Sequence, residues 1–168
     1  MRACTFVFLA MLLTGCGFHL RTYSLDSNVS SFYVESADQN FLTEELRRGL
    51  RQAGAAEADT AGEAELVVEL MDGRRIRRSA STTGSARAAE YEMELGVLFQ
   101  LLNAQGEVMA EPRWITRERV YRVDRDNIVG NNEEQVLIER EMRADLVQSV
   151  VRTINAVAAN PGTGARAG

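Results

Sequence analysis

The sequence contains no lysine and only one histidine, two cysteines and two prolines among its 168 residues. All 19 basic residues are therefore arginines, and 24 acidic residues leave a formal net charge of −5. This acidic balance argues against a nucleic-acid-binding protein. A Ser-His-Asp triad would need the single His19, and no glycine-rich phosphate loop is present. The sequence predicts a protein that is not an enzyme and that holds no cofactor and no metal.

Long apolar runs are missing too, except at the N-terminus. Arg2 precedes an apolar run over residues 3–13, which is too short to cross a bilayer of ~30 Å as a helix. A basic start followed by such a run is typical of an export signal. Residues 13–16 read Leu-Thr-Gly-Cys, which resembles a lipobox, where cleavage falls before a cysteine whose thiol then takes a diacylglyceryl group. The alternative is an ordinary signal peptide with an incidental cysteine.

These features predict four segments. Residues 1–15 form a lipoprotein signal peptide, and residues 16–30 form a tether lipidated at Cys16 (N-palmitoyl, S-diacylglycerol cysteine). Residues 31–158 form a single domain, and residues 159–168 form a disordered tail. Because Cys4 would leave with the signal and Cys16 would carry lipid, no disulfide is expected within the mature chain.

Periodicity over the domain predicts four strands and two helices. The strands cover residues 32–35, 65–78, 89–101 and 107–123, and the helices cover residues 40–53 and 132–157. Asn40 and Asn132 are the expected N-caps of the two helices, and Gly54 is expected to end the first. The last helix carries an apolar stripe, formed by Ile138, Met142, Leu146, Val150, Ile154 and Val157. Within residues 89–101 every second side chain is apolar, which indicates one buried face and one wet face. The order β-α-β-β-β-α predicts an α+β two-layer sandwich, with two helices packed on one face of a four-stranded mixed β-sheet.

The turn at residues 103–106 predicts a hairpin in which Asn103 pairs with Gly106. This register places four pairs across the strands: Glu90 with Arg119 and Glu92 with Arg117 on the wet face, Met93 with Thr116 and Leu95 with Trp114 on the buried face. Pro112 cannot donate to the ladder and could mark a bulge, which would move the pairs beyond it.

Two groups of charged residues are candidates for a binding site. Arg74, Arg75, Arg77 and Arg78 lie close in sequence, and guanidinium groups suit phosphate or carboxylate ligands. Charge balance for an acidic domain or protection of a sheet edge is the slightly favoured explanation, and a GC-rich genome would explain the arginine bias. The glutamates at 90, 92 and 94 are interpreted as the wet face of a strand rather than as a cation site.

Four motifs resemble the LptE family of LPS-assembly lipoproteins. Residues 15–21 read Gly-Cys-Gly-Phe-His-Leu-Arg, residues 46–50 Leu-Arg-Arg-Gly-Leu, and residues 89–93 Ala-Glu-Tyr-Glu-Met, while residues 126–142 are similar to the family's entry into its last helix. The four occur in the family's order over a chain of matching length. The family fold, two helices on a four-stranded sheet, agrees with the pattern above.

The resemblance implies an outer-membrane lipoprotein whose body is periplasmic or inside a partner barrel. Its relatives plug the β-barrel LptD in a 1:1 complex, assist its assembly, and bind lipopolysaccharide during delivery to the outer leaflet. The resemblance also implies that Arg74, Arg75, Arg77, Arg78 and Arg87 are candidates for contact with lipopolysaccharide. Gly130 and Asn131 stand where many members carry a basic residue. The alternative is a non-catalytic envelope lipoprotein module that binds another outer-membrane partner.

Overall fold

The structure is a computed structural model that describes residues 25, 28–36, 40–82, 88–124 and 128–159. The predicted signal peptide, Cys16, Arg87 and the predicted tail beyond residue 159 lie outside the described residues. The elements are β1 (Ser31–Ser36), α2 (Thr43–Gln52), β2 (Ala56–Glu57), a 3₁₀ turn η1 (Ala61–Glu63), β3 (Leu66–Thr82), β4 (Ala88–Leu102), β5 (Val108–Asp124) and α3 (Ile128–Ala159).

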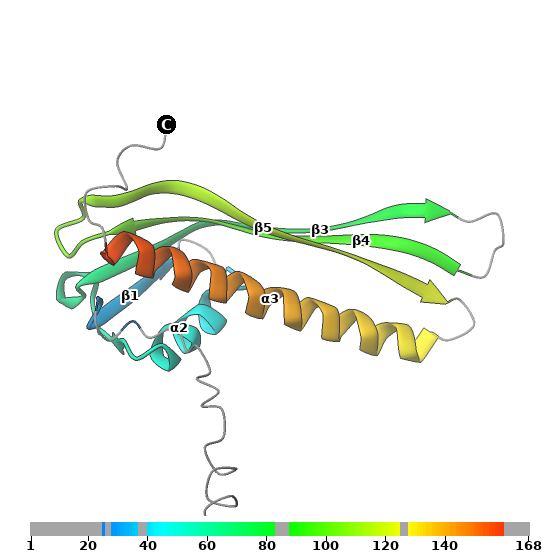
Figure 1. Cartoon of the computed structure of the whole chain (residues 1–168), viewed down its shortest axis with the longest axis horizontal. Helices are drawn as coiled ribbons and strands as arrows, with labels where there is room; N and C mark the ends of the chain where they lie inside the picture. Colours follow the sequence, from blue (N-terminus) through cyan, green and yellow to red (C-terminus); the bar gives the residue numbers. More distant parts are fainter. Residues whose placement is uncertain (1–24, 26–27, 37–39, 83–87, 125–127, 160–168) are drawn as a thin grey trace, which may run out of the picture.

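One mixed sheet runs in the order β2-β1-β3-β4-β5, and α2 and α3 both lie on one of its faces (Figure 1). β1 is parallel to β2 and β3, while β3, β4 and β5 form an antiparallel meander. The α+β two-layer architecture is confirmed, but the predicted count of four strands is wrong by one. The fifth strand, β2, has two residues in a polar stretch without strand periodicity, and backbone pairing alone reveals it: Ala56 N–H donates to the Ser30 carbonyl at 3.0 Å.

The core lies between the sheet and the two helices. β1 contributes Phe32 and Val34, and α2 contributes Leu46 and Leu50, all buried. The predicted apolar stripe of the last helix is buried along its whole length, at Ile138, Met142, Leu146, Val150, Ile154 and Val157. Figure 1 shows α3 running along the three long strands, with β1 and α2 near one end of the sheet. The helix therefore covers the sheet with one continuous apolar face.

The helix boundaries show which local signals hold. The predicted N-cap of the first helix, Asn40, is wrong because Leu42 holds that position; the Asn40 Oδ1 accepts from the Leu42 N–H at 3.0 Å, in the turn just before α2 begins. Gly54 has φ 101° and ends α2 as predicted. The predicted N-cap of the last helix, Asn132, is wrong because α3 begins at Ile128. Asn132 is exposed there, and an asparagine inside a helix costs less than ~0.7 kcal/mol relative to alanine.

The predicted register of the β4–β5 hairpin is also wrong. Arg117 pairs with Leu95 rather than Glu92, and Trp114 pairs with Leu98 rather than Leu95. The remaining predicted pairs move as well: Glu90 faces Arg122, Met93 faces Arg119, and Thr116 faces Gly96. From Arg113 onward the displacement is three residues, an odd number, so each of these side chains of β5 changes face. Trp114 therefore lies on the uncovered face of the sheet, and Arg117 lies on the helix side.

The displacement has three local causes. The turn is one residue longer than predicted, because Asn103 N–H donates to the Glu107 carbonyl at 2.9 Å while Gly106 adopts φ 79°. A turn closed by a glycine in this conformation carries a bulge of its own. Two further register shifts follow, between Leu102 and Leu101 and between Leu101 and Phe99. The second spans Pro112, where the sequence indicated a bulge.

Candidate functional site

The four predicted arginines of β3 alternate between the two faces of the sheet. Arg74 pairs with Gly96 and Arg78 with Glu92, which places both on the uncovered face. Arg75 and Arg77 pair with Leu95 and Met93, whose side chains are buried beneath the helices. The structure thus divides the cluster into two pairs, within a strand that continues to Thr82.

On the uncovered face, the arginines are matched by the glutamates of β4. Glu94 is only 7 % exposed, and Arg78 Nη2 donates to it at 2.7 Å. Arg74 Nη1 lies 3.4 Å from the same carboxylate, and its guanidinium lies 4.4 Å from the centre of the Trp114 ring. The glutamate row predicted on the wet face therefore includes one buried carboxylate, covered by two arginines. Their side chains remain 45 % and 56 % exposed, so both could reach a ligand.

The other two arginines point toward α3 and toward aromatic rings. Arg75 Nη1 lies 3.3 Å from Glu139 of α3. Arg77 lies 3.9 Å from the centre of the Tyr91 ring, which stacks on Tyr121 with centroids 6.0 Å apart. Burial raises the pKa of the Tyr121 phenol, and the positive charge of Arg77 acts against this rise. These contacts fix the orientation of both arginines against the helix side of the sheet.

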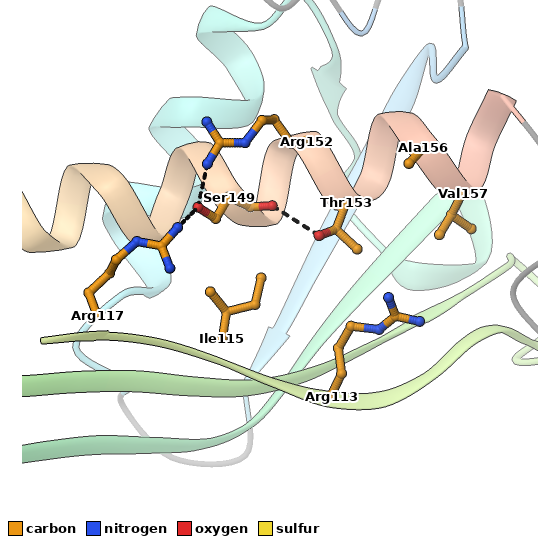
Figure 2. Close-up of a pocket in the computed structure, with 8 residues that line it drawn as sticks. All are labelled: Arg113, Ile115, Arg117, Ser149, Arg152, Thr153, Ala156 and Val157. Carbon is orange, nitrogen blue, oxygen red and sulfur yellow. Dashed lines mark hydrogen bonds between the residues drawn. The ribbon is translucent and has the colours of Figure 1, made fainter. Parts of the chain in front are cut away.

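A second arginine group, which the sequence did not indicate, lines a cleft of about 440 Å³ between β5 and α3. Figure 2 shows the eight lining residues: Arg113, Ile115, Arg117, Ser149, Arg152, Thr153, Ala156 and Val157. The corrected hairpin register explains why Arg113 and Arg117 face the helix at all. Among the described residues that line the cleft, none is acidic.

Ser149, 7 % exposed, is the centre of this group. Its hydroxyl accepts hydrogen bonds from Arg117 Nη2 and, at 2.7 Å, from Arg152 Nη2, and it donates to the Asp145 carbonyl at 2.8 Å (Figure 2). Arg113 enters from β5, and its buried Nε finds no hydrogen-bond partner within the described ranges. Two guanidinium groups thus converge on one neutral oxygen, and Arg113 lies at the other end of the cleft, near Val157 (Figure 2).

A groove of about 730 Å³ between α2 and α3 provides a contrast. It also contains arginines, but Arg143 donates to Glu139 at 2.5 Å and to Glu45 at 3.2 Å. Burial alone would lower the pKa of Arg143, but these bonds outweigh it and raise the pKa. The central cation of this groove is therefore neutralised from within the chain.

A sequence signal for the cleft existed but was ambiguous. Along β5, the row Arg113, Ile115, Arg117, Arg119, Tyr121 and Val123 alternates with the row Trp114, Thr116, Glu118, Val120 and Arg122. Each row mixes apolar and charged residues, so the pattern alone does not decide which one faces the helices. His19, Cys16 and Arg87 lie outside the described residues.

Two kinds of site are not found in the part of the chain that the structure describes. No group of three or more His, Cys, Asp or Glu side chains is placed to hold a metal ion. No described helix has the length and apolar character needed to cross a membrane. The candidate sites are therefore the two arginine groups.

Comparisons with known proteins bear on the family. Residues 29–154 match the family model described as LptE, lipopolysaccharide-assembly. The chain is 28 % identical over 152 residues to the LPS-assembly lipoprotein LptE of Photorhabdus laumondii, an alignment that covers 87 % of this chain and 81 % of that protein.

Solved structures show the same fold. A minor lipoprotein of Acinetobacter baumannii is similar with a TM-score of 0.63 at 24 % identity, covering 76 % of this chain and 92 % of that one. Lipoprotein B of Nitrosomonas europaea is similar with a TM-score of 0.67 at 22 % identity, covering 87 % of this chain and 95 % of that one. At these identities the likeness concerns the fold alone.

Proposed function

This chain belongs to the LptE family, and from that premise we propose that it plugs the β-barrel protein LptD and binds lipopolysaccharide during its delivery to the outer leaflet. The match over residues 29–154 carries the proposal, because it spans β1 through most of α3. The proposed role includes assistance in assembling the barrel and requires no catalysis by this chain.

The uncovered sheet face supports a role in binding. α2 and α3 both pack on the opposite face, so β3, β4 and β5 leave a long surface open to a partner (Figure 1). Trp114 and Val120 on this surface are 38 % and 58 % exposed. Exposed large apolar side chains among arginines and glutamates suit contact with another molecule better than contact with water alone.

We further propose that Cys16 is the lipid-bearing N-terminus, which would anchor the body to the outer membrane on its periplasmic side or inside the barrel. The lipobox-like residues 13–16 support this assignment. Mass spectrometry of the mature N-terminus tests it: a diacylglyceryl and acyl modification on Cys16 is expected. Unmodified Cys16, or normal membrane anchoring of Cys16→Ser, would contradict it.

The barrel partnership is tested by affinity purification of the full-length lipoprotein from detergent-solubilised outer membranes. A stable 1:1 complex with LptD is expected. Recovery of a different outer-membrane protein in its place would instead favour an envelope module with another partner.

For lipopolysaccharide, we propose contacts from the arginines of β3, with Arg74 and Arg78 reaching the ligand from the uncovered face. Arg75 and Arg77 would contribute from the helix side, and Arg87 is a further candidate. Charge-assisted hydrogen bonds contribute about 1.5–3 kcal/mol when well made and less when exposed. Because Glu94 already engages both arginines of the uncovered face, the net gain from a phosphate should fall at the lower end.

The test compares Arg74→Gln/Arg78→Gln with Arg122→Gln, an exposed arginine of the same face paired with Glu90 at 3.1 Å. Weaker lipopolysaccharide binding by the double variant alone is expected, most clearly at low ionic strength, where surface charges are least screened. Equal binding by all three proteins at low salt would show that these arginines serve only the sheet.

A further inference from the structure

We propose that the groove between α2 and α3 binds an acidic amphipathic helix of a partner protein, with Arg48 and Arg140 contacting its carboxylates. The groove has a volume of about 730 Å³ and belongs to the helix layer, and none of the β3 arginines lines it. The inference therefore depends neither on the proposed contacts with lipopolysaccharide nor on the barrel partnership.

The groove lies between two helices that run side by side in the same direction. Arg143 Nη1 lies 3.2 Å from Glu45 Oε1, and one turn later Val147 lies against Gly49. Each helix advances by four residues between these two contacts, which is the spacing expected of parallel neighbours. The next residues of this row that line the groove are Ala53 and Val151. A third helix, whose side chains recur at the same spacing, fits along such a row.

The rims of the groove carry two arginines without a charge partner. Arg48 belongs to α2 and Arg140 to α3, and both are exposed. Among the described residues, neither one has an ion pair or a side-chain hydrogen bond. The carboxylates within four residues of them along each helix already contact other arginines: Glu44 contacts Arg47, Glu45 and Glu139 contact Arg143, and Glu141 contacts Arg119. The two rims therefore present positive charge that the surrounding helix surface does not neutralise.

The two ends of this chain do not supply the missing negative charge. Residues 1–24 and 160–168 contain no aspartate and no glutamate. A carboxylate from a partner protein would neutralise the rims, and opposite charges across an interface steer association and fix the orientation of the partner. Charge complementarity thus indicates an acidic partner.

The lining of the groove favours a helix over a lipid acyl chain. Val147 and Val151 on the floor are only 8 % and 6 % exposed, so an acyl chain would bury little additional apolar surface there. A helix that spans both rims also covers Ala144, which is exposed, and reaches Leu137, which is 51 % exposed in the turn before Arg140. An apolar stripe flanked by carboxylates matches this surface, as in other complexes in which a helix occupies a groove.

The experiment uses the full-length lipoprotein in a neutral detergent and three capped peptides of about 18 residues, or roughly five helical turns. All three carry leucine and alanine on one helical face, and the flanking positions hold glutamate, glutamine or lysine. Fluorescence anisotropy at low ionic strength compares the wild type with Arg48→Gln/Arg140→Gln. The control of equal charge is Arg51→Gln/Arg122→Gln, whose ion-paired arginines lie outside the groove.

The glutamate peptide should bind the wild type, and the glutamine and lysine peptides should bind about tenfold more weakly or worse. The groove variant should bind the glutamate peptide about fivefold more weakly or worse, because two partly screened charge pairs are lost, and the control should stay within about twofold. Absence of binding by the glutamate peptide to the wild type, equal affinities of the three peptides, or equal losses in both variants would overturn the proposal.

Two further measurements address other occupants of the groove. Displacement of the glutamate peptide by dihexanoyl phosphatidic acid would assign the groove to an anionic lipid. Self-association of the wild type in sedimentation velocity, lost in the groove variant alone, would assign it to a second copy of this chain. Either result would overturn the proposal of an acidic partner helix, which expects neither.

A footprinting measurement needs no variant and covers the case in which the double substitution changes the fold. Phenylglyoxal modifies accessible guanidinium groups, and peptide mass spectrometry locates the product. The glutamate peptide should slow modification of Arg48 and Arg140 in the wild type and leave Arg122 unchanged. Equal rates with and without the peptide at all three positions would also overturn the proposal.

Discussion

Arg117 lies directly opposite Leu95 in the β4–β5 ladder, and its guanidinium reaches the Ser149 hydroxyl of α3. Because Leu95 is fully buried, this pairing turns an arginine of the edge strand toward the helix. Arg119 follows on the same face and contacts Glu141 of α3 at 3.2 Å. The contact between α3 and the edge strand therefore combines these polar pairs with apolar residues such as Ile115 and Tyr121.

Replacing Glu94 with Gln should lower the free energy of unfolding by about 1–2 kcal/mol, measured by urea unfolding. The substitution removes the charge that Arg74 and Arg78 share, and the half-exposed arginines keep the cost below that of a fully buried pair. Glu118→Gln is the matched control, since Glu118 faces Glu94 directly across the ladder. Like charges in this position are destabilising, so the control should be neutral or slightly stabilising. Equal losses of unfolding free energy in the two variants would show that Arg74 and Arg78 do not stabilise Glu94.

The contact between the two helices should depend on Gly49. A Cβ added there would lie 2.4 Å from Val147 Cγ1, and valine has little freedom to move aside. Gly49→Ala should therefore cost about 1–3 kcal/mol, although alanine favours a helix by up to ~1 kcal/mol over glycine.

Val147→Ala tests the mechanism of that effect, because it removes the methyl group that the new side chain meets. The double variant should be more stable than the sum of the single changes indicates, by about 1 kcal/mol in chemical unfolding. Strict additivity would show that the two helices do not meet at this point.

Much of the fold followed from periodicity. The row of alternate apolar residues in β4 and the stripe of α3 predicted which faces are buried, because each element has one clearly apolar side. Leu66, Val68 and Leu70 gave the same signal in β3. Gly54 marked the end of α2 for a backbone reason, since its φ of 101° favours glycine.

The face of β5 could not be predicted in this way. Both of its rows mix arginines with apolar residues, so the prediction of its buried face depended on counting residue pairs from the turn. One extra residue in the turn and two bulges changed that count by three. The cleft residues Arg113 and Arg117 were missed for this reason. Ser149 was missed because the polar residues around it on α3, Asp145, Arg152 and Thr153, follow no pattern that indicates a site.

Glu65 should make stability depend on pH in the acid range. The backbone N–H of Ser30 at 2.8 Å and then its hydroxyl at 2.7 Å donate to the Glu65 carboxylate and lower its pKa below 4.5. A lowered folded-state pKa means that the unfolded chain binds more protons. The contribution of these hydrogen bonds to the free energy of unfolding is therefore complete above about pH 4.5. It is lost as the pH falls through the folded-state pKa of Glu65.

Unfolding by urea across the acid range checks this dependence. The difference in unfolding free energy between the wild type and Glu65→Gln should be constant near neutral pH and shrink toward acid. Ser30→Ala removes one of the two donors and should show a smaller pH dependence than the wild type. A difference that does not vary with pH would show that the carboxylate is not held by Ser30.

The last prediction uses Trp114, the single tryptophan of the chain, to test the hairpin register. In the structure it pairs with Leu98 on the uncovered face and is 38 % exposed. The register predicted from the turn alone would place it opposite Leu95 in the core. The folded protein should therefore show acrylamide quenching of its fluorescence intermediate between that of a buried tryptophan and that of the unfolded chain. Phe99→Trp in a Trp114→Phe background supplies the buried reference, since Phe99 is 1 % exposed. Quenching of the wild type as weak as that of this reference would mean that Trp114 faces the helices and that Arg113 and Arg117 face away from the cleft.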